Sequence, residues 1–90
     1  MLDKEIILKI VEDSFTNVVE KNKSFSFEEE FIGSNTRLES IEIVQVISYI
    51  EENLEKKGIK GFDLFEYIYE FETLTFDKLA ILIEENINTN

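Results

Sequence analysis

Apolar residues recur at steps of three and four positions through residues 2–19, which is the spacing of one face of an α-helix. Asp3, Lys4, Glu12 and Asp13 fall between them as solvated positions. The pattern therefore predicts an amphipathic first helix. Its apolar face consists of Ile6, Ile7, Ile10, Val11, Phe15, Val18 and Val19.

Residues 25–39 show no sustained period, and Gly33-Ser34-Asn35 within them is a good turn signal. We interpret this stretch as a long structured loop. A short helix beginning at Ser26, with Glu29 completing a capping box, is an alternative for its first part. The side chains expected to pin the loop to the core are Phe27, Phe31, Ile32 and Leu38.

The clearest helix of the sequence spans residues 40–54. Val44 lies at the margin of its apolar face on a helical wheel, and Gln45, Ser48 and Glu52 lie opposite. Lys56-Lys57-Gly58 then places cations in the last turn and a glycine just beyond, which suits the helix dipole and a left-handed cap. The expected core face consists of Ile43, Val46, Ile47, Ile50 and Leu54.

Residues 62–71 are aromatic and apolar, and Leu64, Phe65 and Ile68 follow helical spacing. They predict a short third helix. A strand is the rival interpretation, because residues 67–69 have β propensity. The phenylalanines of this segment are expected to be core first and pocket lining second: Phe62, Phe65 and Phe71.

A last helix is expected to begin after Thr75, which has the character of an N-cap. Pro is absent and Gly occurs three times, so little interrupts helices. The chain is predicted to be an all-α, four-helix bundle, with three longer helices, one short helix and a long loop between the first two. Residues 1–90 should form a single domain, because so short a chain cannot supply two cores. The last helix should turn inward Phe76, Leu79, Ala80, Ile83 and Ile87.

Cysteine and histidine are both absent from the sequence. The chain therefore has no disulfide, no thiolate ligand, no general base of the usual kind near neutral pH, and none of the commonest metal ligand. The acidic cluster Glu28-Glu29-Glu30 lacks the alternating ligand spacing of a calcium loop. We expect neither a metal site nor an enzyme.

The formal net charge is −11, from 20 acidic and 9 basic residues. The electric field of so negative a chain repels phosphate backbones and favours partners with basic docking surfaces, so nucleic acid is not an expected ligand. No apolar run is long enough to span a membrane, and the first residues do not resemble a signal peptide. We expect a cytoplasmic monomer.

The most informative stretch is residues 31–47, in which a glycine-containing loop leads to Glu39-Ser40-Ile41 at the start of the second helix. This stretch resembles the acyl carrier protein family, whose hallmark is Asp-Ser-Leu at that place. Glu39 stands for the usual aspartate and Ile41 for the usual leucine. The acidic end of the helix and the order of the helices extend the similarity over nearly the whole chain.

The resemblance implies that Ser40 is an attachment point. In this family a phosphopantetheinyl transferase moves 4'-phosphopantetheine from coenzyme A onto the serine in a magnesium-dependent step, and the acyl group is carried as a thioester on the thiol of the arm. The physical setting suits this role, because a phosphate is tolerated at a helix N-terminus. The aromatic third segment suggests a specialised carrier in lipid, polyketide or sugar-modification biosynthesis and not a housekeeping one.

Three alternatives to an acyl carrier stay open at this level. An aminoacyl or peptidyl carrier would use the same chemistry. An unmodified acidic helical adaptor could bind a basic protein surface without any arm. Ser40 could also be no more than an N-cap, with Glu39 stabilising the helix dipole.

Every charged residue from Glu39 to Glu55 is acidic, which suits brief electrostatic docking of partner enzymes. Ile41 is apolar yet lies on the exposed side of the wheel, where a partner would have to cover it. The resemblance implies a recognition face formed by Glu39, Ile41, Glu42, Gln45, Ser48 and Glu52. The candidates for sheltering an acyl chain are Ile43, Val46, Ile47, Ile50 and Phe65.

Overall fold

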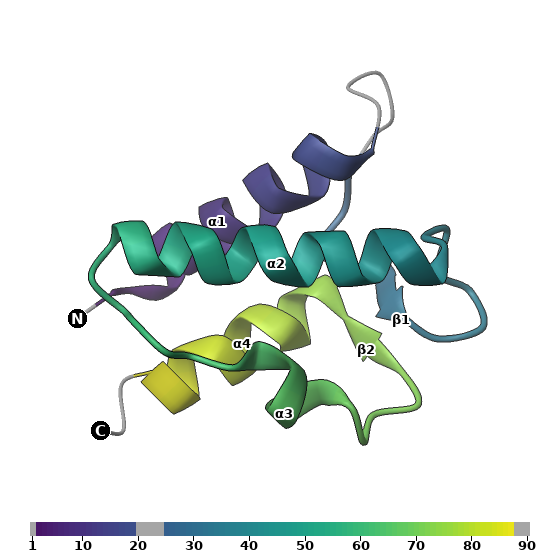
Figure 1. The fold of residues 1–90 in the computed structure, drawn as a ribbon. Coiled ribbons are helices and arrows are strands. Elements are labelled where there is room, and N and C mark those ends of the chain that lie inside the picture. The colour runs from purple at the N-terminus through teal and green to yellow at the C-terminus, as the bar shows by residue number, and fades with distance from the viewer. Residues whose placement is uncertain (1, 20–24, 88–90) are drawn as a thin grey trace.

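The computed structural model describes residues 2–19 and 25–87 (Figure 1). These residues are mostly helical, as predicted, but they also contain a small two-stranded sheet that the all-α prediction missed. The elements are α1 (Lys4–Val18), β1 (Glu30–Ile32), α2 (Ser40–Lys56), α3 (Leu64–Ile68), β2 (Leu74–Thr75) and α4 (Phe76–Ile87).

The core lies between three longer helices. α1 packs against both α2 and α4, and the short α3 packs against α2. In Figure 1, α2 runs across the front of the molecule, with its first turn beside β1 and its last turn at the opposite end. Fully buried side chains come from every helix, among them Ile7, Phe15, Val46, Ile50, Leu64 and Ile83. One apolar interior therefore holds the described residues together.

α1 is shorter than the apolar pattern suggested because Asp3 caps it. The Asp3 carboxylate accepts a hydrogen bond of 3.0 Å from the Ile6 backbone N–H, so the helix begins at Lys4. Ile6 was expected on the buried face but is 37% exposed. Phe15 and its neighbours on that face are buried as predicted.

The first part of the long loop forms a single turn, and the alternative of a short helix beginning at Ser26 is wrong. The Ser26 N–H donates to Glu29 Oε1 at 3.1 Å, and the Ser26 hydroxyl accepts from the Glu28 N–H at 3.2 Å. The side chains of Ser26 and Glu29 thus form hydrogen bonds typical of the start of a helix. No helix follows, because Glu30 already belongs to β1. Pairing with a distant strand has overridden the local signal.

The two strands pair in an antiparallel manner, with Glu30 opposite Thr75, and this pairing connects the long loop to α4. The loop also supplies acceptors for the first turn of α4. The Asp77 N–H donates to the Phe27 carbonyl at 2.8 Å, and the Phe76 N–H donates to the Glu29 carbonyl at 3.1 Å. These amides have no partner within their own helix, so the loop caps α4.

Thr75 is the N-cap of α4, as predicted. Its hydroxyl accepts a hydrogen bond of 3.2 Å from the Lys78 N–H. Phe76 then enters the middle of an aromatic cluster, with ring centroids within about 5 Å of Phe15, Phe25 and Phe31. Of the predicted loop anchors, Phe31 and Leu38 are buried, and Phe27 and Ile32 are partly buried against the core.

α2 extends two residues beyond the predicted end and closes as the sequence suggested. Gly58 has a φ of 92°, and the Ile59 N–H bonds back to the Leu54 carbonyl at 2.9 Å, which is a Schellman ending. Gly58 supplies the left-handed conformation that other residues adopt only with strain.

α3 is a helix and not a strand, so the rival interpretation of residues 67–69 is wrong. Its first N–H, from Leu64, donates to Glu51 Oε2 of α2 at 2.8 Å. This contact turns Leu64 and Ile68 inward. Phe65 and Phe71, which were expected to be core, are 52% and 41% exposed.

Candidate functional site

Ser40 is the first residue of α2, and its side chain is exposed. The N-cap position is occupied by Glu39, so the interpretation of Ser40 as the cap is wrong. The Ser40 hydroxyl takes part in none of the hydrogen bonds identified among residues 2–19 and 25–87. It is therefore open to a visiting enzyme.

The loop that leads to Ser40 is fixed by its own polar contacts. Glu30 Oε1 accepts from the Asn35 N–H at 3.2 Å, and the Thr36 hydroxyl donates to the Phe31 carbonyl at 3.0 Å. Gly33 has a φ of 144°, and a β-carbon there would collide with the Glu30 carboxylate. The Gly33-Ser34-Asn35 turn is therefore specified by backbone geometry and by close packing.

Arg37 attaches the end of this loop to the aromatic cluster. Its guanidinium lies 2.8 Å from Glu29 Oε1 and 5.1 Å from the ring centroid of Phe15. The pair combines a charge-assisted hydrogen bond with a cation–π contact. Because Arg37 is three residues before Ser40, these contacts hold the start of α2 in a defined place.

The first turn of α2 is closed by a capping box between Glu39 and Glu42. The backbone ladder begins with the Ile43 N–H, which donates to the Glu39 carbonyl at 3.0 Å, so the earlier amides have no carbonyl partner in the helix. The Glu39 N–H donates to Glu42 Oε1 at 2.8 Å. The positive end of the helix dipole lies at Ser40, the first residue of the helix.

The residues predicted for the recognition face lie on the outer side of α2. Glu42 is partly buried, and the other members are exposed. Ile41 is 62% exposed, as the wheel predicted. The exposed members are Glu39, Ile41, Gln45, Ser48 and Glu52. Whether partners dock on them stays a prediction.

An apolar groove of about 300 Å³ opens beside Ser40, between α2 and α3. We call it the Ser40 groove. None of its lining residues is charged, although 29 of the 90 residues of the chain are acidic or basic. The lining residues are Ile32, Ser40, Ile43, Val44, Ile47, Phe65, Ile68, Tyr69 and Phe71.

The structure divides the predicted acyl-pocket residues into two groups. Ile43, Ile47 and Phe65 line the Ser40 groove. Val46 and Ile50 are fully buried and lie outside its lining. Sequence reasoning did not assign four lining residues to a pocket, because no local signal shows which side chains of the loop, α2 and the α3 segment meet: Ile32, Val44, Ile68 and Tyr69.

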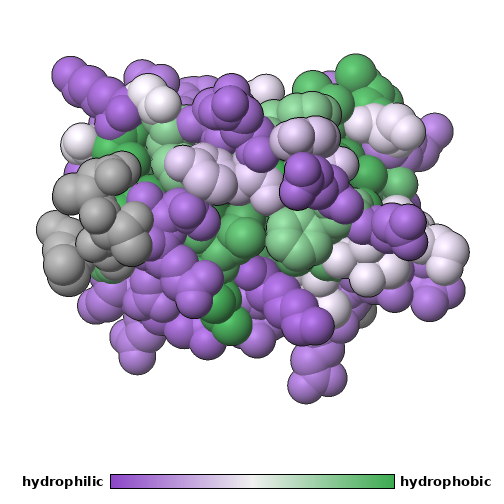
Figure 2. All heavy atoms as spheres, turned by 90° about the horizontal axis from the view of Figure 1, so that it is seen from below, coloured by the Kyte–Doolittle hydropathy of each residue, from purple (hydrophilic) through white to green (hydrophobic). Residues whose placement is uncertain are grey.

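The surface around α3 is unusually apolar. Phe65, Tyr67, Tyr69 and Phe71 are all more than a third exposed. Figure 2, which views the molecule from below, shows hydrophobic side chains reaching the surface between strongly hydrophilic ones.

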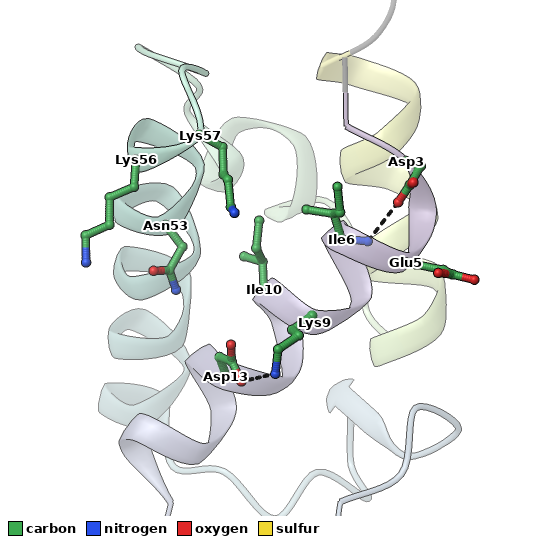
Figure 3. A pocket seen from close by; sticks show the side chains of 9 residues that line it. All are labelled: Asp3, Glu5, Ile6, Lys9, Ile10, Asp13, Asn53, Lys56 and Lys57. Atoms are coloured by element: carbon green, nitrogen blue, oxygen red, sulfur yellow. Dashed lines mark hydrogen bonds and ion pairs between the residues drawn. The ribbon is translucent and has the colours of Figure 1, made fainter.

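A larger pocket, of about 560 Å³, lies between α1 and the last turn of α2, away from Ser40 (Figure 3). Two of its lysines are paired with carboxylates, Lys9 with Asp13 at 3.5 Å and Lys56 with Glu52 at 3.7 Å. The side chain of Lys57 points toward Ile10, whereas that of Lys56 points away from α1. No lining residue carries a hydroxyl, so this pocket offers no attachment oxygen.

Two properties of the described residues concern metals and membranes. No three acidic, histidine or cysteine side chains among residues 2–19 and 25–87 come together as metal ligands would. Within the same residues, every helix is too short or too polar to cross a bilayer.

Comparisons of the chain with protein-family models, with curated proteins and with solved structures find no match. Over residues 2–19 and 25–87, the fold is small and mostly helical, with four helices and a two-stranded sheet. The particular function of the protein has to be inferred from the site around Ser40.

Proposed function

We propose that this protein is a carrier that holds acyl intermediates as thioesters on a 4'-phosphopantetheine arm attached to Ser40. The single observation that carries the proposal is the exposed, uncommitted hydroxyl at the first position of an acidic helix, in the sequence context Glu39-Ser40-Ile41. The aromatic α3 segment favours a specialised carrier. The resemblance to acyl carrier proteins supplies the chemistry.

The attachment is a phosphoryl transfer from coenzyme A. The Ser40 oxygen forms a new bond to the phosphorus that bears the pantetheine, the bond from that phosphorus to the adenosine bisphosphate breaks, and the hydroxyl proton leaves. The chain has no histidine or cysteine to activate Ser40, so the base and the magnesium belong to a transferase. Once attached, the arm supplies a thiol that carries acyl groups.

The residues of this chain provide binding and orientation. The first turn of α2 offers backbone amides and a helix dipole to the phosphate. The exposed carboxylates of α2 attract enzymes with basic docking surfaces, and Ile41 gives them an apolar contact. Brief, steered docking suits a carrier that has to visit several enzymes.

Intact-mass measurement after co-expression with a broad-range phosphopantetheinyl transferase tests the proposal. We expect a gain of one phosphopantetheinyl group in the wild-type chain and no gain in Ser40→Ala. The matched control is Ser34→Ala, an exposed serine outside the predicted recognition face, which should gain the arm normally. Ser40→Ala should fold as the wild type does, because Glu39 and not Ser40 caps the helix.

An unchanged mass in the wild-type chain would refute the carrier proposal and favour the acidic adaptor. The adaptor interpretation also predicts that Ser40→Ala binds its basic partner normally. An arm that accepts an aminoacyl group and not an acyl group would select the aminoacyl or peptidyl carrier.

A further inference from the structure

The pocket between α1 and the last turn of α2 is a second concave surface of the molecule, and its lining residues are labelled in Figure 3. We call it the α1–α2 pocket. Its volume of about 560 Å³ lies within the range of about 300–1,000 Å³ that small-molecule sites have. The 17 residues of α2, which span about 25 Å, separate it from Ser40. An occupant of this pocket would therefore be distinct from a group on Ser40.

Two isoleucines of α1 form the apolar part of the α1–α2 pocket. Ile6 is 37% exposed although it follows the apolar pattern of the helix, and Ile10 lies about one turn further along. Both side chains point into the space between α1 and α2 (Figure 3). A ligand that covered Ile6 would remove apolar surface from water, which is favourable by about 25 cal/mol per Å².

Lys57 supplies a positive charge beside this apolar surface. Its side chain extends from the end of α2 toward Ile10 (Figure 3). The other two lysines of the lining form ion pairs with carboxylates. Lys57 forms no such pair among residues 2–19 and 25–87. The pocket therefore combines exposed aliphatic surface with one positive charge that is available to a ligand.

A polar contact at one side of the pocket joins its two walls. The Asn53 amide, which belongs to the lining, donates a hydrogen bond of 3.2 Å from Nδ2 to Ser14 Oγ. Ser14 is fully buried, so this bond connects α1 to α2 away from competing water. Because the two helices are already joined, a ligand would not have to order the pocket, and that lowers the cost of binding.

The charges around the pocket favour a ligand with one negative charge. Asp3 and Asp13 are among the lining residues, and the whole chain carries a net charge of −11. An acidic protein segment or a polyanion would be repelled by this field. A single carboxylate would gain a charge-assisted contact with Lys57, and an aliphatic chain attached to it would cover Ile6 and Ile10.

We propose that the α1–α2 pocket binds an aliphatic monocarboxylate, with its carboxylate beside Lys57 and its chain against Ile6 and Ile10. The ligand binds without covalent attachment, whether or not Ser40 is modified. The inference therefore does not depend on the proposed function.

Nuclear magnetic resonance titration of the full chain with octanoate tests the proposal. We expect saturable shifts of the methyl resonances of Ile6 and Ile10 and of the side-chain resonances of Lys57. The matched ligand is 1-octanol, which has the same number of carbons and no charge. It should bind roughly three- to fivefold more weakly, because a partly exposed ion pair contributes modestly to affinity.

Three variants separate the contribution of the charge from that of the apolar surface. Lys57→Gln should bind octanoate about as weakly as 1-octanol and should leave the affinity for 1-octanol unchanged. Lys60→Gln is the matched control, since it removes the same charge from an exposed lysine that does not line the pocket. Ile6→Ala should weaken the binding of both ligands. Circular dichroism verifies that each variant is folded.

Four outcomes would overturn the proposal. The first is the absence of saturable shifts with octanoate, and the second is equal affinity of the wild type for octanoate and 1-octanol. The third is an equal loss of octanoate affinity in Lys57→Gln and Lys60→Gln. The fourth is a set of shifts confined to Phe65 and Tyr69, which would place octanoate in the Ser40 groove. A chain that gains no arm at Ser40 but binds octanoate as described would overturn the proposed function and support this inference.

Discussion

The hydrogen bond between Glu51 and Leu64 gives the sharpest prediction about stability. Glu51 Oε2 accepts from the first N–H of α3 at 2.8 Å in a partly buried setting, and it is the contact that orients the wall of the Ser40 groove. Glu51→Ala removes the acceptor and leaves the Leu64 N–H without its partner. We expect α3 to lose its anchorage on α2.

The magnitude follows from the charge of the acceptor. A hydrogen bond to a charged group contributes about 1.5–3 kcal/mol, and partial exposure reduces this to about 1–2 kcal/mol here. For a domain of this size, 1 kcal/mol lowers the melting temperature by roughly 4–8 °C. Glu51→Ala should therefore melt roughly 4–16 °C below the wild type.

Glu52→Ala is the matched control. It removes one carboxylate from the same helix, with the same change in net charge and in helix propensity. Among the described residues, the Glu52 side chain forms an exposed ion pair with Lys56 at 3.7 Å, which contributes about 0.5 kcal/mol or less. The difference between the two variants isolates the hydrogen bond to α3.

Thermal and urea denaturation followed by circular dichroism measure the difference. Amide hydrogen exchange adds a local readout, because the Leu64 N–H should lose protection in Glu51→Ala and keep it in Glu52→Ala. Equal melting temperatures together with unchanged protection of Leu64 would refute the role assigned to Glu51.

Three further predictions concern the loop, the acidic face and the net charge. Gly33→Ala should lower the free energy of unfolding, measured by urea denaturation, by about 2 kcal/mol, and Gly61→Ala should lower it by about 1 kcal/mol. Both glycines have a positive φ, but of the two a β-carbon meets the Glu30 carboxylate at Gly33 alone. Equal losses would contradict the packing argument. Glu42→Gln should slow transfer of the arm by roughly two- to fivefold at low salt, while the equally charged change Glu12→Gln on α1 should leave the rate alone. If both rates are unchanged, docking does not use the acidic face. The melting temperature should rise with added salt, because screening relieves repulsion in a chain of net charge −11, and a flat response would exclude that repulsion as a factor.

The long helices were predictable because their periodicity agrees with their packing. The start of α2 at Ser40, the buried face that includes Val46 and Leu54, and the N-cap at Thr75 all follow from local patterns that tertiary structure reinforces. The exposure of Ile41 followed from the wheel for the same reason.

The errors share one physical cause, which is the dominance of contacts between distant residues. The all-α prediction missed β1 because its partner strand lies far along the sequence, and the same pairing excludes the alternative of a helix at Ser26, although Ser26 and Glu29 form the hydrogen bonds of a helix start. Phe65 is exposed because Glu51 of another helix sets the rotation of α3. A five-residue helix has too little periodicity of its own to decide its inner face.

The capping of α4 by the long loop has a consequence for the order of folding. About 45 residues of chain separate Glu30 from its partner Thr75, and the first amides of α4 bond to carbonyls of Phe27 and Glu29. During synthesis these early residues have to wait for residues 74–77 before they can adopt their final conformation. The loop that leads to Ser40 therefore reaches its native surroundings only after the start of α4 has been synthesised, and an enzyme that requires those surroundings would act only from that point on.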